Sequence, residues 1–148
     1  MERRRFVNWF LGLSSTALFG SVLYPVWRYM NPPDVPEAST NRVEAGPTND
    51  PALLDSGFKI IQFGTLPVIL IRVSDDDFRA FSATCTHLDC IVEYQKPEQR
   101  IWCNCHNGEY NLQGEVVSGP PPKPLEEYEV DLVDNGPGQP RTVVVTKA

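Results

Sequence analysis

Hydrophobic residues are distributed in two different ways along this 148-residue chain. An unbroken uncharged stretch runs from Phe6 to Trp27, whereas after residue 50 short apolar runs alternate with turn residues. A long uncharged run is typical of a single helix, and runs of about four to eight residues bounded by Gly, Pro or Asp are typical of strands. The pattern therefore predicts one helix followed by a β-rich body.

The uncharged stretch has the length of a membrane span. As a helix its 22 residues would extend about 33 Å, and the hydrocarbon core of a bilayer is roughly 30 Å thick. Trp9 and Trp27 would lie at the two membrane interfaces. No small-residue cleavage site follows, as a removed signal peptide requires, and no polar face repeats, as a soluble buried helix requires. We expect residues 1–30 to be a retained transmembrane anchor.

Three arginines, Arg3 to Arg5, precede this stretch. Positive residues favour the cytoplasmic side, which predicts an N-terminus inside and a body on the outer, periplasmic face of a prokaryotic cytoplasmic membrane. Together with Phe6 and Val7 the arginines also match the core of a twin-arginine export signal. That route carries folded proteins, and it would be needed if a cofactor were inserted in the cytoplasm.

Residues 31–51 contain five prolines and no large apolar side chain except two valines, which predicts an extended hinge or linker. Runs such as FKIIQF (58–63) and PVILIRV (67–73) then predict that residues 52–148 form one antiparallel all-β domain. The first thirty residues carry +3, so the remainder carries −9 of the total −6. An acidic body excludes nucleic acid as a partner and suits a basic protein.

Every cysteine and histidine of the chain lies in two short clusters, CTHLDC (85–90) and CNCHNG (103–108). Three explanations fit these residues. Two structural disulfides would leave both histidines unexplained. A Cys2His2 zinc site would leave two cysteines over. A [2Fe–2S] centre, with two Cys on one iron and two His on the other, needs one Cys and one His from each cluster.

The two clusters closely resemble the two cluster-binding boxes of the Rieske iron–sulfur proteins, and SGPPPKPL (118–125) resembles the proline-rich loop of that family. The resemblance implies a Rieske-type antiparallel β sandwich with a small cluster-binding subdomain and one [2Fe–2S] cluster per chain. It implies that Cys85 and Cys103 bind one iron and that His87 and His106 bind the other. It also implies a disulfide between Cys90 and Cys105, and a hydrogen bond from Tyr110 to a ligand sulfur.

The subgroup that the chain resembles is the anchored subunit of quinol–cytochrome c oxidoreductases. The resemblance implies a cytochrome b-type membrane partner, a c-type cytochrome acceptor and quinol as reductant. His87 and His106 would be the catalytic residues at the domain tip, with His106 in contact with quinol, and Pro120 to Pro122 would shield the cluster. One anchor and one linker would let the tip move between its two partners.

The second box departs from the pattern of high-potential members, which read Cys-Pro-Cys-His-Gly-Ser-x-Tyr. Here Asn107 and Gly108 follow the histidine, so that Gly108 replaces a serine whose hydroxyl bonds a bridging sulfide. Loss of a donor to a negatively charged sulfur disfavours the reduced state and lowers the potential. The departure therefore favours menaquinol over ubiquinol as the reductant.

Other functions compete with this interpretation. The small Rieske subunit of an arsenite oxidase-like molybdoenzyme shares export and disulfide features, and co-purified molybdenum or b-type haem would separate the two hypotheses. A soluble Rieske ferredoxin would need neither the anchor nor the additional cysteines. A structural β module would bind no iron.

Overall fold

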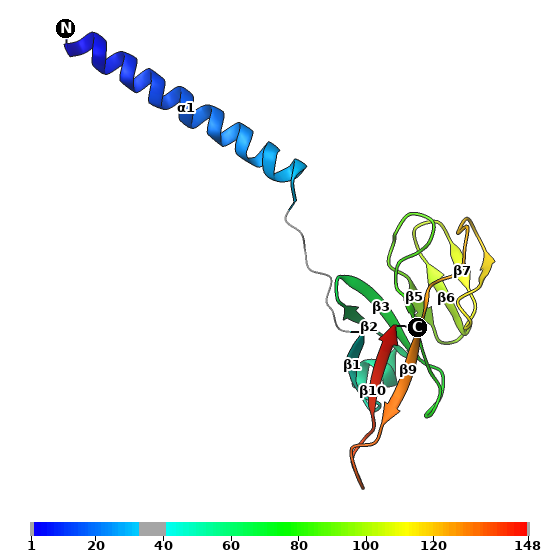
Figure 1. Cartoon of the computed structure of the whole chain (residues 1–148). Helices are drawn as coiled ribbons and strands as arrows, with labels where there is room; N and C mark the ends of the chain where they lie inside the picture. Colours follow the sequence, from blue (N-terminus) through cyan, green and yellow to red (C-terminus); the bar gives the residue numbers. More distant parts are fainter. Residues whose placement is uncertain (1, 33–40, 148) are drawn as a thin grey trace. The chain divides into compact units, whose positions relative to one another are not determined.

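The computed structural model describes residues 2–32 and 41–147, and the chain forms two compact units, Met1–Pro36 and Glu37–Ala148 (Figure 1). The first unit contains helix α1, Glu2–Met30, with every side chain exposed. The helix is long and apolar enough to cross a membrane. Ser14 and Thr16 donate their hydroxyl hydrogens to the backbone carbonyls of Phe10 and Gly12, so these polar groups are satisfied within the helix itself.

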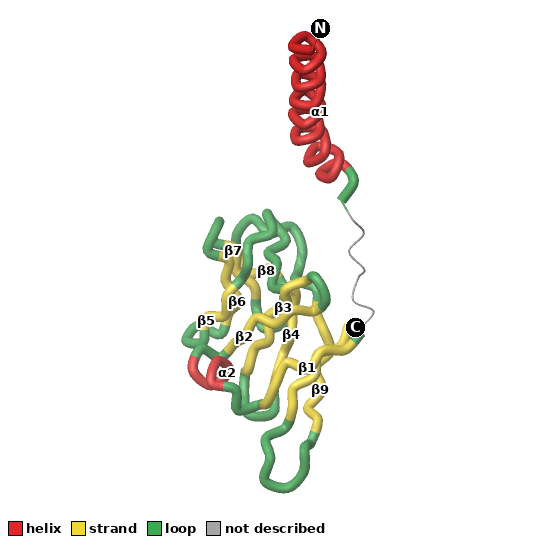
Figure 2. The backbone as a smooth tube through the Cα atoms, turned by 90° about the vertical axis from the view of Figure 1, so that its left-hand side faces the viewer, coloured by secondary structure: helices red, strands yellow, loops and turns green. Residues whose placement is uncertain are grey.

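The second unit is built from two antiparallel sheets, as the sequence predicts (Figure 2). One sheet has six strands in the order β1-β10-β9-β4-β3-β2, and the other has four in the order β5-β6-β7-β8. The strands are β1 Arg42–Pro47, β2 Phe58–Phe63, β3 Leu66–Arg72, β4 Phe78–Ser82, β5 Glu93–Gln95, β6 Arg100–Cys103, β7 Gly108–Tyr110, β8 Val116–Ser118, β9 Glu127–Val133 and β10 Thr142–Lys147.

Strand β3 separates two hydrophobic cores. Because successive side chains of a strand point to opposite faces, Val68 and Leu70 enter one core, while Ile69 and Ile71 enter the other. All four side chains are fully buried, which explains why this strand is a continuous apolar run. The second core also contains Tyr110 and both free thiols, so that β3 supports the region of the two boxes.

The linker predicted to end at residue 51 differs from the structure. Residues 42–47 form β1, which pairs with β10, and helix α2, Pro51–Asp55, buries Leu53. The prolines favour a linker, but Val43 and Ala45 alternate with polar residues, which is typical of a short edge strand. Residues 33–40 of the predicted linker lie outside the described part of the chain.

Asp50 connects α2 to β2, and through Lys59 to β1, by hydrogen bonds and an ion pair. Its Oδ1 accepts a hydrogen bond from the backbone N–H of Ala52 (2.9 Å), which caps α2, and its Oδ2 pairs with Lys59 Nζ (2.6 Å). Lys59 also donates to the carbonyl of Ala45 in β1 (3.2 Å). The hydrogen bond from Lys59, followed by that from Ala52, holds the pKa of Asp50 below its ordinary value of 3.8.

We expect Asp50→Ala to lower the free energy of unfolding by about 1–2 kcal/mol at pH 7, because it removes the cap and the ion pair. Asp50→Asn keeps the capping oxygen and should lose less. Since the folded-state pKa lies below the unfolded one, the contribution of the carboxylate is present above about pH 4 and disappears as the pH falls through the folded pKa. Urea titrations of the full chain at several pH values measure this, and equal losses in both variants would contradict the capping role.

Candidate metal centre

The two Cys/His boxes come together on two loops. The first box follows β4 and closes on itself, because the backbone N–H of Cys85 donates to the carbonyl of Cys90 (2.8 Å). The second box is the turn between β6 and β7, where Cys103 pairs with Gly108. A disulfide between Cys90 and Cys105 joins the two loops, as the family resemblance implies.

The four predicted iron ligands lie in two pairs. Cys85 and Cys103 are each 2% exposed, and neither takes part in a disulfide. The rings of His87 and His106 meet edge to face, with centroids 4.7 Å apart. His106 is exposed, whereas His87 is half-buried, and its Nδ1 is buried without a hydrogen-bond partner among the described residues. An imidazole nitrogen in that position is unfavourable unless something binds it.

The donor set fits a cluster held by two thiolates and two imidazoles. Burial raises the pKa of the Cys85 thiol, but hydrogen bonds from the Tyr110 hydroxyl and from the backbone N–H of His87 outweigh it, so that the pKa lies below the ordinary 9.0. The pKa of Cys103 is raised, first by burial and also by the thiol of Cys85 beside it. Two buried neighbouring thiols of this kind, next to an orphaned imidazole nitrogen, are well suited to a metal that takes up both sulfurs as thiolates.

A second set of sulfurs is also close together, because Cys90, Cys103 and Cys105 lie within 4.8 Å of one another. This trio does not provide three thiolates, since Cys90 and Cys105 are joined in the disulfide. Within the described residues the sulfurs available to a metal are therefore those of Cys85 and Cys103.

Tyr110 connects the thiol of Cys85 to the proline-rich loop. Its hydroxyl lies 3.3 Å from Cys85 Sγ and 3.2 Å from both the backbone nitrogen and Oγ1 of Thr86. Thr86 Oγ1 in turn donates to the carbonyl of Lys123 (2.7 Å). The family resemblance implies the contact of Tyr110 with a cysteine sulfur but not the contacts of Thr86, whose position inside the first box was the available signal.

The proline-rich loop packs directly on the second box. A Cβ atom on Gly108 would lie 2.7 Å from Cγ of Pro121, a contact that real Cβ atoms do not make. Pro121 is buried, and its ring lies where the side chain of a residue other than glycine at position 108 would begin. A serine at position 108 would therefore fit only if Pro121 moved.

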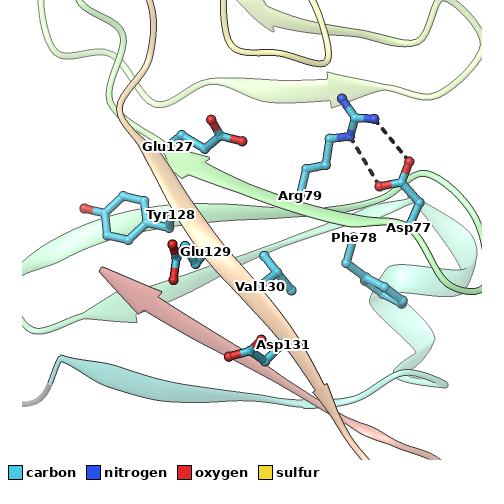
Figure 3. Close-up of a pocket in the computed structure, with 8 residues that line it drawn as sticks. All are labelled: Asp77, Phe78, Arg79, Glu127, Tyr128, Glu129, Val130 and Asp131. Atoms are coloured by element: carbon cyan, nitrogen blue, oxygen red, sulfur yellow. Dashed lines mark hydrogen bonds and ion pairs between the residues drawn. The ribbon is translucent and has the colours of Figure 1, made fainter. Parts of the chain in front are cut away.

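One hollow of the second unit does not resemble a metal centre. It has a volume of about 640 Å³, lies between β4 and β9 and is lined by Asp77, Arg79, Glu127 and Glu129 among others (Figure 3). Arg79 pairs with Asp77 (3.2 Å) and donates to the carbonyl of Leu112 (2.8 Å), which joins β4 to the segment that follows Tyr110. With no cysteine or histidine in its lining, this hollow plays no part in holding the cluster.

Comparison with known proteins agrees with the geometry. Residues 35–129 match the family model of the Rieske [2Fe-2S] domain. The cytochrome b6-f complex iron-sulfur subunit of Chlorobaculum tepidum is 36% identical over 133 residues, which are 90% of this chain and 72% of the relative. The subunit of the same name from Chlorobaculum thiosulfatiphilum is 31% identical, over 99% of this chain and 76% of the relative.

Two solved structures share the fold. The cyanobacterial plasma membrane Rieske protein from Synechocystis PCC 6803 superposes with a TM-score of 0.57 at 26% identity, covering 72% of this chain and 99% of that one. The ferredoxin of carbazole 1,9a-dioxygenase from Nocardioides aromaticivorans superposes with a TM-score of 0.58 at 18% identity, covering 74% of this chain and 100% of that one. The second likeness concerns the fold alone.

The disulfide yields a prediction about the stability of the site. Cys90 and Cys105 are 15 residues apart, and closing a loop of that length stabilises the folded state by about 3 kcal/mol in the chain-entropy model. We expect Cys90→Ser to lower the melting temperature and to shorten the lifetime of the bound metal centre, while leaving the iron ligands in place. The Cys90→Ser/Cys105→Ser variant should lose as much as Cys90→Ser alone, and a single variant as stable as the parent would contradict a stabilising bridge.

Proposed function

Because the chain belongs to the Rieske [2Fe-2S] domain family, we propose that it is the electron-transfer subunit of a membrane-bound quinol–cytochrome c oxidoreductase. The observation that carries the proposal is the arrangement of two buried thiols beside two facing imidazoles, on loops joined by a disulfide. The thiolates of Cys85 and Cys103 would hold one iron of a Rieske-type [2Fe–2S] cluster, and the imidazoles of His87 and His106 the other.

The cluster supplies one-electron chemistry at a potential within roughly −150 to +300 mV. The protein supplies the contact with the reductant, and we assign this contact to His106, since its side chain is exposed while that of His87 is half-buried. The ring of His106 would accept the hydrogen bond of a quinol hydroxyl. Tyr110, completely buried, would keep its hydroxyl directed at the sulfur of Cys85 and exclude water from that side.

The proposed partners follow from the anchor, the charge and the relatives. Curated relatives are subunits of cytochrome b6-f complexes, which supports a cytochrome b-type membrane partner. Helix α1 would hold the domain at the membrane that contains the quinol, with the arginines 3–5 inside and the domain on the outer, periplasmic face. The −9 charge of the remaining chain suits a basic c-type cytochrome as acceptor.

We assign menaquinol as the reductant on the basis of Gly108 and Pro121. A serine hydroxyl at position 108 would donate to a charged sulfur and favour the reduced state, but the ring of Pro121 occupies its place. An apolar ring offers no donor, so that the potential is low and matches a low-potential quinol. The alternative, a subunit of an arsenite oxidase-like molybdoenzyme, gains no support from the relatives reported above, and molybdenum in the purified complex would favour it.

The test of the proposed function is an EPR-monitored redox titration of the full chain purified in detergent. The parent should show the Rieske signal when reduced, and His87→Ala and His106→Ala should each abolish it, since each removes an iron ligand. Cys90→Ser is the control, because it should keep the signal with a shorter lifetime. A signal that survives in the double His87→Ala/His106→Ala variant would contradict the ligand assignment.

The assignment of menaquinol is tested by a pair of double variants. Gly108→Ser/Pro121→Ala makes room for a hydroxyl donor, and Gly108→Ala/Pro121→Ala makes the same room without one. A hydrogen bond to a charged acceptor contributes on the order of 1.5–3 kcal/mol. The reduction potential changes only by the difference in this energy between the oxidised and the reduced cluster. We expect the serine variant to have a potential higher than the alanine variant by roughly 40–90 mV. Equal potentials with intact EPR signals would remove the main support for menaquinol.

A further inference from the structure

Asn107 adopts a left-handed backbone conformation, which few residues other than glycine and asparagine take. Its φ is +56°, in the left-handed region, where glycine is the usual residue and asparagine is tolerated at a cost. High-potential members of the family have glycine here, which adopts this conformation freely. For a residue with a side chain the conformation has a cost that glycine does not have, so a contact made by that side chain helps to keep the turn in one conformation.

Trp102 provides that contact. Its indole Nε1 donates a hydrogen bond of 2.8 Å to Oδ1 of Asn107. Trp102 lies in β6 opposite Glu109 of β7, while the next pair along, Ile101 and Tyr110, points into the core. The bond therefore spans the outer face of the β6–β7 hairpin, where Trp102 is half-buried and Asn107 is exposed.

The other side of the same turn is closed by the proline-rich loop. A Cβ atom on Gly119 would lie 2.6 Å from the carbonyl oxygen of Asn107 and 2.8 Å from Cα of Gly108. The backbone of the loop thus rests on the Asn107–Gly108 peptide. If this peptide rotated, its carbonyl would have to pass Gly119, so the loop restrains the peptide while the indole bonds to the side chain of Asn107.

We propose that Trp102 and Asn107 are positioning residues for His106, the residue immediately before Asn107. Their hydrogen bond fixes the left-handed turn and thereby keeps the exposed ring of His106 edge to face with His87, at 4.7 Å between centroids. A functional side chain keeps its position when the residues that support it are themselves fixed by packing and hydrogen bonds. The inference rests on the proposed function, in which both histidines bind iron.

Three variants test the proposal in the full, cluster-loaded chain. Trp102→Phe keeps an aromatic ring in the strand and removes the donor, and Asn107→Ala removes the acceptor. Asn107→Asp keeps the acceptor oxygen. Trp27→Phe, in helix α1, is the matched control for loss of an indole elsewhere. The readouts are the line width of the reduced-cluster EPR spectrum, the half-time of cluster loss and the melting temperature.

We expect Trp102→Phe and Asn107→Ala to broaden the EPR lines and to accelerate cluster loss about fivefold, the factor supplied by one ordinary net hydrogen bond. Asn107→Asp and Trp27→Phe should resemble the parent. The Trp102→Phe/Asn107→Ala double variant should lose cluster no faster than Asn107→Ala, because both substitutions remove the same bond.

Unchanged line width and half-time in Trp102→Phe would overturn the proposal, even with a lower melting temperature, since that pattern indicates a structural role only. Additive effects in the double variant, or an Asn107→Asp variant as impaired as Asn107→Ala, would overturn it as well. A failure of the proposed function looks different: the parent itself would show no Rieske signal.

Discussion

The structure places two thiols and an imidazole nitrogen in a region from which water is largely excluded, and the loops around them have to keep that arrangement. Cys85 and Cys103 are almost completely buried, and Nδ1 of His87 has no partner among the described residues. A buried polar atom without a partner is unfavourable, so a metal bound at Nδ1 of His87 would stabilise the folded loops. Three features oppose the opening of these loops: the disulfide, Tyr110 and the proline-rich loop.

These supports come from parts of the chain that are distant in sequence. The disulfide joins the two boxes to each other, and Tyr110 joins β7 to the first box. Lys123, in the proline-rich loop, accepts the hydroxyl of Thr86. Beneath them β3, buried on both faces, connects the six-stranded sheet to the core that contains the thiols.

Much of this was predictable from the sequence because it depends on residue types in local patterns. The uncharged run predicted the helix, the alternation of apolar runs and turns predicted the antiparallel sheets, and the two boxes indicated which cysteines and histidines would lie together. β1 was missed because it contributes only Val43 and Ala45 to the core and forms its hydrogen bonds with the far end of the chain. The contact between Gly108 and Pro121 was missed for a related reason. It depends on the path of a loop thirteen residues further on, which no local pattern determines.

The two residues after His106 have different surroundings, so that one affects the conformation of the turn and the other affects the reduction potential. Asn107 lies on the outer side of the hairpin, where its side chain contacts Trp102. A substitution there affects the conformation of the turn more than the charge near the thiols. Gly108 is buried against Pro121, so a substitution there changes what the proline-rich loop can place near the sulfurs. In a glycine–serine pair the first residue adopts the turn without help and the second supplies a donor. In this chain the turn depends on the hydrogen bond from Trp102, and Gly108 supplies no donor. The orientation of the histidine and the reduction potential can therefore change independently.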